Sequence, residues 1–381
     1  MDSLRGPPGV ATRAGVVGFG LHGSASPLPV HPLSMRIASV SLKHPSRLVT
    51  NDEIVTLLQQ CSNGVDPKVL RKYQRLVRGL LKRTGSVTRY VRDVQRGERA
   101  SDLVRDAMLQ ALEQAAMAPS DIDLLIYCGV GKGFLEPANA YFYAQATGLT
   151  CSCFDIADAC MSWMRALEIS YRFLRSGTLR TAMIINGEFN YKEHGYPENF
   201  EVKGLEQLEY TFPTYTIGEA ATATIVTASD AEWRFDYHSV PELCGLCNIP
   251  LDGYEDFVEL SDRIALNGVN KFVAYGHELF ARAEEYLLPL VRRTVGDLNA
   301  PHIYFPHAAS SVAYLRAGRA AGIRNGKVYS EVFPKMGNLV SASIPAAMVM
   351  AEAEGRLSRG DRVVLVPASA GMVFGVGQFT Y

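Results

Sequence analysis

Cys160 stands where an apolar, strand-like segment (FDIADAC, 154–160) meets an amphipathic helical segment (MSWMRALEISYRFLRSG, 161–177). The positive end of a helix dipole and its free N–H groups stabilise a thiolate, so this position predicts a lowered thiol pKa. The same N–H groups can hold the oxyanion that forms when a thiolate attacks a carbonyl. On these residues alone, a structural cysteine remains an equal alternative.

Two further polar residues in the second half of the chain extend this pattern. His307 lies in IYFPHAASS, where a strand gives way to a loop, and Asn338 follows Gly337 just before a helix of small residues. A single histidine is commonly a satisfied core or surface residue, and an asparagine after glycine is commonly part of a turn. The combination of a thiol, an imidazole and a carboxamide is what points to catalysis.

The segments around these residues resemble the thiolase-fold condensing enzymes, specifically the ketoacyl synthase III family. FDIADACMSWMRALEIS resembles the family's nucleophile segment, FPHAAS its histidine loop and GNLVSASIPAA its asparagine segment. Three more segments match: RTGSVTRY (83–90), TIGEAATATIV (216–226) and the C-terminal VPASAGMVFGVGQF. The resemblance covers residues 36–381 in the family's order.

The resemblance implies an α/β protein with the five-layered αβαβα thiolase fold, built from two pseudo-duplicated halves. It implies that Cys160 takes an acyl group from a thioester, with the N–H groups of Cys160 and Ala370 as the oxyanion hole. His307 and Asn338 would donate hydrogen bonds to the carbonyl of a second thioester. The substrates would be acyl-CoA or acyl carrier protein thioesters, without a cofactor or metal, and the enzyme would be a homodimer.

Glu136, in LEP (135–137), separates this chain from the members that initiate fatty-acid synthesis. The motif resembles the branch that joins two acyl chains head to head, which includes olefin-pathway enzymes and bacterial pyrone synthases. In that branch the glutamate reaches the partner subunit's active site and removes a proton from the α-carbon of the second acyl group. Burial would raise the carboxyl pKa and suit it to this role. The alternative is that Glu136 caps the helix that follows.

The predicted function is therefore a non-decarboxylative Claisen condensation of two acyl thioesters, giving a β-keto product that can cyclise to a pyrone. The alternatives are a decarboxylative ketosynthase that uses malonyl thioester, an acyltransferase to oxygen or nitrogen, and a catalytically silent partner subunit.

Substrate contacts are less defined by the sequence. Arg83 could pair with a phosphate, but Gly79 stands where the initiating members carry a tryptophan that stacks on adenine, so coenzyme A and acyl carrier protein both stay open. We expect Phe134 and Trp163 to line or block the acyl channel. The basic run RKYQRLVRGLLKR (71–83) is either a docking stripe for an acidic carrier protein or a solvated helix face.

Composition and charge argue against several other classes of protein. With 38 Lys and Arg against 39 Asp and Glu, the net charge of -1 gives no field that favours nucleic acid or an anionic membrane. No apolar run approaches the ~20 residues of a membrane-spanning helix. The odd number of seven cysteines forms no disulfide framework, which predicts reduced thiols and a cytoplasmic location. Cys244 and Cys247 form a single CxxC, which is weak evidence for zinc.

The order of elements predicts three parts. Residues 1–35 are expected to form a flexible extension, 36–229 the half with the nucleophile, and 230–381 the half with His307 and Asn338. Residues 192–215 form a polar, aromatic-rich insertion within the first half, and loops of that length are commonly lids or binding segments.

Overall fold

The first of two five-stranded sheets is built from the N-terminal half of the chain. The computed structural model describes residues 34–189, 198–259 and 261–381. In the strand order β1-β7-β6-β4-β5, β4 is parallel to β5 and β6, whereas β7 is antiparallel to β1 and β6. The strands are β1 (Ser34–Lys43), β4 (Leu124–Cys128), β5 (Ser152–Ile156), β6 (Thr181–Glu188) and β7 (Ala220–Ser229).

The second sheet is built from the C-terminal half. Its order is β11-β12-β14-β13, with β8 also paired to β14; β11 and β12 are parallel and the other pairs are antiparallel. The strands are β8 (Trp233–Ser239), β11 (Ile303–Pro306), β12 (Arg362–Val366), β13 (Ala368–Ser369) and β14 (Val373–Thr380).

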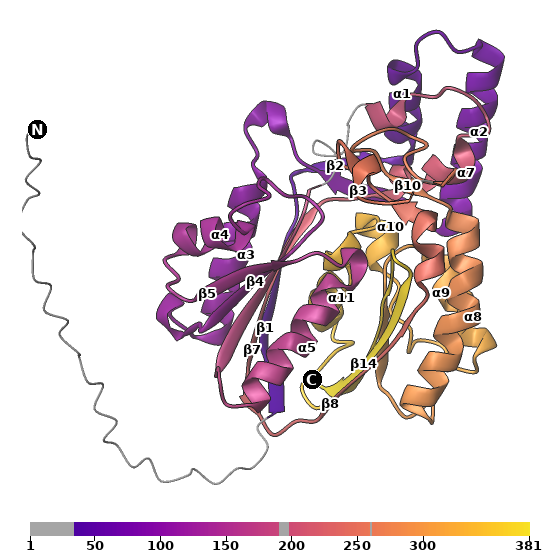
Figure 1. Cartoon of the computed structure of the whole chain (residues 1–381). Helices are drawn as coiled ribbons and strands as arrows, with labels where there is room; N and C mark the ends of the chain where they lie inside the picture. Colours follow the sequence, from indigo (N-terminus) through magenta and orange to yellow (C-terminus); the bar gives the residue numbers. More distant parts are fainter. Residues whose placement is uncertain (1–33, 190–197, 260) are drawn as a thin grey trace, which may run out of the picture. The chain divides into compact units, whose positions relative to one another are not determined.

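Helices and sheets alternate in five layers, as predicted (Figure 1). Two helices cover the outer face of the first sheet, two lie between the sheets, and two cover the outer face of the second sheet. In that order they are α3 (Ala100–Ala115) and α4 (Asn139–Thr147), α5 (Ser162–Arg175) and α11 (Ser343–Ala353), and α8 (Gly276–Val295) and α9 (Ser311–Ala320).

The remaining elements lie outside the two large sheets and the six helices of the layers. They are α1 (Asn51–Cys61), α2 (Pro67–Thr84), α7 (Leu208–Thr211), α10 (Val332–Met336) and the short strands β2 (Arg47–Thr50), β3 (Thr88–Val91), β9 (Cys247–Asn248) and β10 (Val273–Ala274). Short 3-10 helices are η1 (Val94–Arg96), η2 (Pro119–Asp121), η3 (Ala159–Met161), η4 (Glu198–Phe200), η5 (Phe212–Thr216), η6 (Pro241–Leu246), η7 (Tyr254–Asp256) and η8 (Val340–Ala342).

The sequence explains why the central layers are covered on both sides. Every residue of β4 (LLIYC) and β6 (TAMIINGE) is buried, which is typical of strands that carry helices on both faces. Helix α11 (SIPAAMVMAEA) has small and apolar residues on nearly all sides, as expected for a helix between two sheets. One large apolar cluster accordingly contains residues of both sheets, α5 and α11.

The boundaries of the three predicted parts and of the predicted insertion can be compared with the elements of the structure. Residues 1–33 of the expected extension lie outside the described residues, and 34–35 begin strand β1. Residues 192–197 of the predicted insertion are likewise outside them, and the rest of it forms η4, α7 and most of η5. The division at 229/230 falls between the two sheets but remains an interpretation, since both sheets belong to one compact unit. No helix in the described ranges is long and apolar enough to cross a membrane.

Candidate active site

Cys160 lies in the 3-10 turn η3, two residues before the first residue of α5. The chain enters this turn through Ala159, whose φ of 43° is uncommon for a residue with a Cβ atom. The Ser162 hydroxyl accepts a hydrogen bond from the Asp158 N–H at 2.9 Å and so closes the turn at the start of the helix. The thiol is therefore presented by a strained strand-to-helix turn and not by the helix itself.

A second hydroxyl joins this turn to the C-terminal sheet. Ser369, at the end of β13, donates a hydrogen bond to the Asp158 carbonyl at 3.0 Å. The next residue, Ala370, lines the same cavity as Cys160. The fold thus places both predicted oxyanion-hole residues at one cavity, although they come from different sheets.

Burial raises the pKa of the Cys160 thiol well above its usual value, and Cys247 and Glu188 nearby raise it further. Hydrogen bonding from its own backbone and from Ser369 acts in the opposite direction and does not outweigh burial. The expected lowering by the helix dipole is therefore wrong for this structure. The thiol precedes the helix in an enclosed position, where a thiolate would lose its hydration. A raised pKa favours the protonated thiol, which must lose its proton during acyl transfer.

Asn338 is fixed by its backbone and by one end of its carboxamide. Its N–H donates to the Thr216 carbonyl at 2.8 Å, and its carbonyl accepts from the Gly218 N–H at 3.0 Å. Its Oδ1 accepts the Val340 N–H at 2.9 Å. No described residue accepts a hydrogen bond from Nδ2, so this amino group is available to a ligand in the cavity that Asn338 lines.

Two glycines allow this close approach of segments that are far apart in the sequence. A Cβ atom at Gly218 would lie 1.9 Å from the Met336 carbonyl oxygen. At Gly337, where φ is +77°, a Cβ atom would lie 2.4 Å from the Thr216 carbonyl oxygen. Any other residue would push the two segments apart and displace Asn338.

His307 follows β11 and is 5% exposed. Burial lowers its pKa from 6.5 to about 4, while a hydrogen bond with the Val340 backbone acts in the opposite direction. The imidazole is therefore neutral at neutral pH and can donate from one ring nitrogen only. Val340, whose φ is +49°, donates its N–H to Asn338, whereas the buried Nδ1 of His307 has no hydrogen-bond partner among the described residues.

These groups surround a cavity of about 320 Å³. Cys160, Asn338, Ala370 and Val340 all line it, whereas His307 is absent from its wall. The structure thus brings three of the predicted groups together, the thiol, the carboxamide and the residue of the second oxyanion N–H, and it does not place the imidazole in the cavity wall. Such a site can bind a carbonyl and stabilise negative charge on its oxygen.

Glu136 lies on the loop between β4 and α4, which leaves this cavity at Lys132 and runs to the surface. Its side chain is exposed and forms no hydrogen bond or ion pair within the described ranges. The neighbouring Phe134 and Leu135 are 51% and 90% exposed. This loop therefore exposes two apolar side chains and an unpaired carboxylate side by side on the surface.

The alternative role of Glu136 as a helix cap has no support in the structure. The carboxylate of Asp155, on β5, accepts hydrogen bonds from the N–H groups of Asn139 and Ala140 at 2.9 and 3.1 Å. These are the first two residues of α4, so the start of that helix is already satisfied.

Comparison with known proteins shows which family this chain resembles. Residues 297–381 match the model described as 3-oxoacyl-[acyl-carrier-protein (ACP)] synthase III C terminal. A beta-ketoacyl-[acyl-carrier-protein] synthase III of Aliarcobacter butzleri is 28% identical over 320 residues, which cover 79% of this chain and 89% of that protein. The synthase III of Clostridium botulinum (strain Langeland) is 23% identical over 343 residues, covering 87% and 94%. The chain is thus similar to ketoacyl synthases III over most of its length, and its C-terminal residues 297–381 match that family's model. It is a condensing acyltransferase.

Solved structures agree with the family fold. OleA of Xanthomonas campestris, crystallised with lauric acid and lauroyl-CoA, superposes with a TM-score of 0.75 at 21% identity and covers 91% of this chain and 99% of OleA. FabH, the 3-oxoacyl-(acyl carrier protein) synthase III of Xanthomonas oryzae, superposes with a TM-score of 0.74 at 21% identity, covering 92% and 100%. At such identity the likeness shows the thiolase fold alone.

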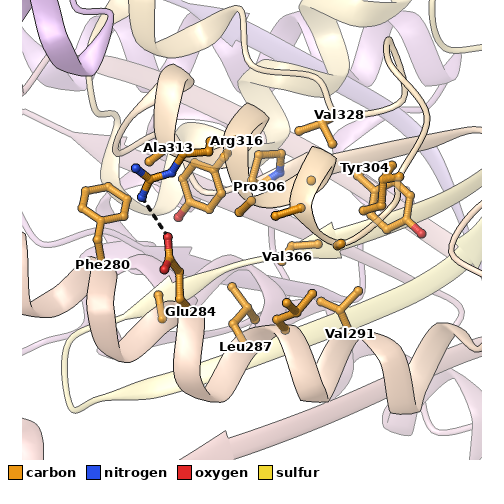
Figure 2. Close-up of a pocket in the computed structure, with 18 residues that line it drawn as sticks. Phe280, Glu284, Leu287, Val291, Tyr304, Pro306, Ala313, Arg316, Val328 and Val366 are labelled. Carbon is orange, nitrogen blue, oxygen red and sulfur yellow. Dashed lines mark hydrogen bonds and ion pairs between the residues drawn. The ribbon is translucent and has the colours of Figure 1, made fainter.

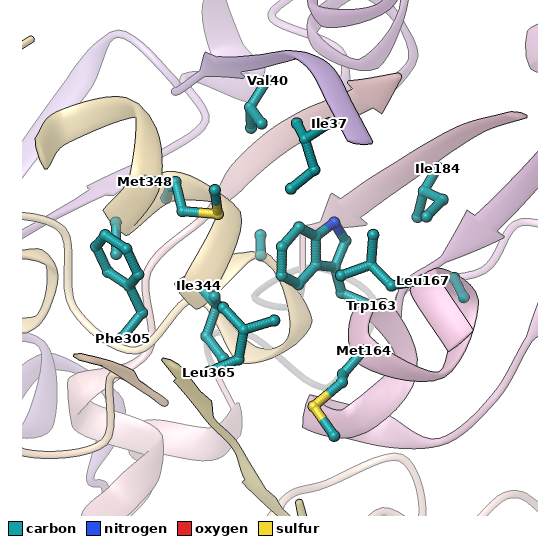
Figure 3. Packing of buried hydrophobic residues seen from close by; sticks show 14 of the residues in the cluster. Ile37, Val40, Trp163, Met164, Leu167, Ile184, Phe305, Ile344, Met348 and Leu365 are labelled. Carbon is teal, nitrogen blue, oxygen red and sulfur yellow. The ribbon is translucent and has the colours of Figure 1, made fainter. Parts of the chain in front are cut away.

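Two residues that were predicted to line or block the acyl channel lie outside the cavity that Cys160 lines. Trp163 is 1% exposed and packs in the core between the sheets, near Ile37 and Leu167 (Figure 3), where its indole N–H donates to Thr224 Oγ1 at 3.0 Å. Its assignment to the acyl channel is corrected, because its position on α5 turns it toward the sheet and away from the cavity. Phe134 stacks on Phe142 at the surface, with ring centroids 4.5 Å apart, and lines no cavity described for this chain.

Several residues that line the cavity were not predicted from the sequence as site residues. Asn199 and Thr214 come from the predicted insertion, whose length was the available signal. Cys247 also lines the cavity, and burial raises its pKa to about 12. Arg83 is exposed in the last turn of α2, without an ion pair to any described residue, and its phosphate role stays a prediction. Within the described ranges, no three His, Cys, Asp or Glu side chains are grouped to hold a metal.

Proposed function

We propose that the enzyme loads an acyl group onto Cys160 and condenses it, without decarboxylation, with a second acyl or 3-oxoacyl thioester to release a β-keto product. The observation that carries the proposal is the cavity that Cys160, Asn338 and Ala370 share. A thioester carbonyl placed there would have the nucleophile and two kinds of N–H donor within one enclosed space.

In the first step the Cys160 sulfur attacks the donor thioester carbonyl. The N–H groups of Cys160 and Ala370 stabilise the oxyanion, and the donor thiol leaves with the proton that Cys160 gives up. The product is an acyl group on Cys160, still a thioester and therefore still activated for attack by carbon. Acyl-CoA and acyl carrier protein are both compatible donors, with Arg83 as a candidate phosphate contact.

In the second step the acceptor thioester loses an α-proton and its enolate attacks the acyl carbonyl on Cys160. Neutral His307 and the free Nδ2 of Asn338 donate hydrogen bonds to the enolate oxygen. The new carbon–carbon bond forms as the Cys160 sulfur leaves, and a 3-oxoacyl acceptor gives a product able to close into a pyrone.

Glu136 of a second copy of the chain is the proposed base. An unactivated acyl thioester cannot supply its own carbanion, whereas malonyl thioester gains one by losing carbon dioxide. The exposed Phe134 and Leu135 beside Glu136 form an apolar surface that suits cover by a partner in a homodimer. Burial in that interface would raise the carboxyl pKa into the range useful for proton abstraction.

The second candidate is a decarboxylative ketosynthase that uses malonyl thioester. Its support is the names of several relatives, which are beta-ketoacyl-[acyl-carrier-protein] synthases III. In that reaction Glu136 would have no proton to remove.

The Glu136→Gln variant separates the two candidates. We expect acylation of Cys160, measured by intact mass, to proceed as in the wild type, and condensation of two acyl-CoA molecules to fall by at least about 100-fold, the contribution typical of a general base. Glu113→Gln, which changes an exposed carboxylate on α3, is the matched control.

Two outcomes would contradict the proposal. Product formation that requires malonyl donor and is insensitive to Glu136→Gln would establish the decarboxylative reaction. Absence of acylation of folded wild-type Cys160 by every thioester would indicate a silent partner subunit.

A further inference from the structure

A second cavity of about 320 Å³ lies between α8 and α9 (Figure 2), and Tyr314 is part of its wall. It shares no lining residue with the Cys160 cavity, and its charged side chains Glu284 and Arg316 form an ion pair with each other at 3.0 Å. The wall of the Cys160 cavity is instead contacted from behind by buried polar side chains of β6 and β7. These side chains are therefore placed to act on the Cys160 site.

The central member of this group is the carboxylate of Glu188, the last residue of β6, which is fully buried. Its Oε2 accepts the Val130 N–H at 3.3 Å, and its Oε1 accepts both the Ser341 N–H at 3.2 Å and the Ser341 hydroxyl. Val130 belongs to the loop after β4, whereas Ser341 is the middle residue of η8. Both segments line the Cys160 cavity, the first through Val130 and the second through Val340. Glu188 therefore joins two parts of the cavity wall that are far apart in the sequence.

Two further side chains extend this contact into a chain of hydrogen bonds. Asn186, also on β6, donates from Nδ2 to the Ser341 hydroxyl oxygen at 2.8 Å. The Thr222 hydroxyl, on β7, donates to Asn186 Oδ1 at 3.0 Å. The Ser341 hydroxyl thus accepts from Asn186 and donates to Glu188, and all four side chains are buried. Buried hydrogen bonds in such a chain polarise and strengthen one another, so they hold Ser341 more firmly than one contact would.

Val340 connects this chain of hydrogen bonds with Asn338. Its φ of +49° is a rare conformation for a β-branched residue, and such a conformation persists only where the surrounding structure holds it. Glu188 holds the peptide N–H that follows Val340, and the N–H of Val340 itself donates to Asn338 Oδ1 at 2.9 Å. With its oxygen held by that N–H, the carboxamide directs Nδ2 away from Val340. The conformation of Val340 therefore determines where the Asn338 amino group points.

We propose that Glu188 is a positioning residue for the condensation step: it fixes Ser341, and thereby keeps Val340 in the conformation that orients the Asn338 carboxamide toward the enolate oxygen. This inference rests on the proposed role of Asn338 in the second step. Without the carboxylate, Val340 relaxes, its N–H leaves Asn338 Oδ1 and the carboxamide turns. Acylation of Cys160 does not use Asn338. The negative charge of Glu188 raises the pKa of the Cys160 thiol, so loss of that charge does not hinder ionisation of the thiol.

The test is a double-mutant cycle, because a residue that acts through Asn338 has no effect on condensation once the Asn338 side chain is removed. Condensation is measured by product mass in the wild type, Glu188→Gln, Asn338→Ala and the double variant, with incubations long enough to quantify the slowest. The acceptor is the thioester that the wild type uses, since Asn338 acts on the enolate oxygen in either candidate reaction. Glutamine keeps the shape of glutamate, but its amino group cannot accept the N–H of one of the two segments.

We expect Glu188→Gln to lower the condensation rate by about tenfold or more in the wild-type background and by less than about twofold in the Asn338→Ala background. Acylation of Cys160, measured by intact mass, proceeds at the wild-type rate in Glu188→Gln. A role of Glu188 in the fold alone would give the same loss of condensation in both backgrounds.

Asp123→Asn is the matched control. Asp123 also accepts two backbone N–H groups, those of Arg180 at 2.8 Å and Thr181 at 3.1 Å, but it does so at the opposite end of β6. We expect this variant to condense at the rate of its background in both cases. Ser341→Ala removes only the hydroxyl that donates to Glu188, so it gives the same pattern with a smaller loss and replaces Glu188→Gln in the cycle if that variant does not fold.

Two results overturn the inference and leave the proposed function standing. The first is a loss of condensation that is equal in both backgrounds, or no loss in either. The second is a slowed acylation of Cys160 in folded Glu188→Gln, which would place the effect of the carboxylate in the first step. If Asn338→Ala itself condenses at the wild-type rate, the role of Asn338 in the proposed function fails first, and the positioning role of Glu188 fails with it.

Discussion

Burial of His307 makes the stability of the protein depend on pH in a predictable window. Its pKa is lowered to about 4 in the folded state, against 6.5 for an unperturbed ring. As the pH falls from about 6.5 to 4, His307 becomes protonated in the unfolded chain but stays neutral in the folded protein. The free energy of unfolding therefore falls through this window. The folded and unfolded pKa values differ by about 2.5, and each pKa unit corresponds to about 1.36 kcal/mol, so the free energy of unfolding falls by about 3 kcal/mol over the window.

The measurement compares wild type with His307→Gln, which cannot titrate. Urea unfolding followed by the fluorescence of the buried Trp163 and Trp233 gives the free energy of unfolding at about pH 7.5 and 4.5. Carboxylates titrate in both proteins and cancel in the comparison. We expect the wild type to lose roughly 2.5 kcal/mol more than the variant between these two pH values.

The reasoning is refuted if the two proteins lose stability in parallel. That result would mean that the folded protein accepts a proton on His307 as easily as the unfolded chain does. The imidazole would then be hydrated or mobile and could not serve as the neutral hydrogen-bond donor that the proposed second step requires.

Three further predictions concern the site and its surroundings. Cys160→Ser should reduce carbon–carbon bond formation to background, measured by product mass, because serine gives neither a thiolate nor an activated thioester; product at the wild-type rate would place the nucleophile elsewhere. Asn338→Ala should leave acylation of Cys160 intact and lower condensation by about 10²–10³-fold, as for loss of one oxyanion donor; equal loss of both steps would contradict its assignment to the second. Trp163→Ala should lower the free energy of unfolding by about 3–5 kcal/mol and leave unchanged the ratio of dodecanoyl to acetyl that Cys160 takes from an equimolar mixture of the two p-nitrophenyl esters, measured by intact mass; an altered ratio would restore Trp163 to the acyl channel.

The order of the elements and the identity of the catalytic candidates could be predicted from the sequence. Continuous apolar runs such as TAMIINGE indicated strands covered on both faces, and the structure buries every residue of that strand. Gly337 and Gly218 stood in the matching segments, and close backbone approach explains why glycine is needed at both. These features follow from short-range rules, because a residue's conformational range and a strand's periodicity are encoded within a few neighbouring positions.

Placement of side chains relative to distant segments was decided only by the tertiary structure. Trp163 lies on a helix next to Cys160 in the sequence, yet the helix turns it into the core. The helix dipole predicted a lowered Cys160 pKa, and burial by elements from both sheets raises it. The cavity beside Tyr314 exists because small residues on α9 meet α8, and neither helix pattern specifies its partner. Hydrophobic periodicity determines which face of an element is apolar, whereas burial, electrostatics and empty space depend on what the folded chain brings against that face.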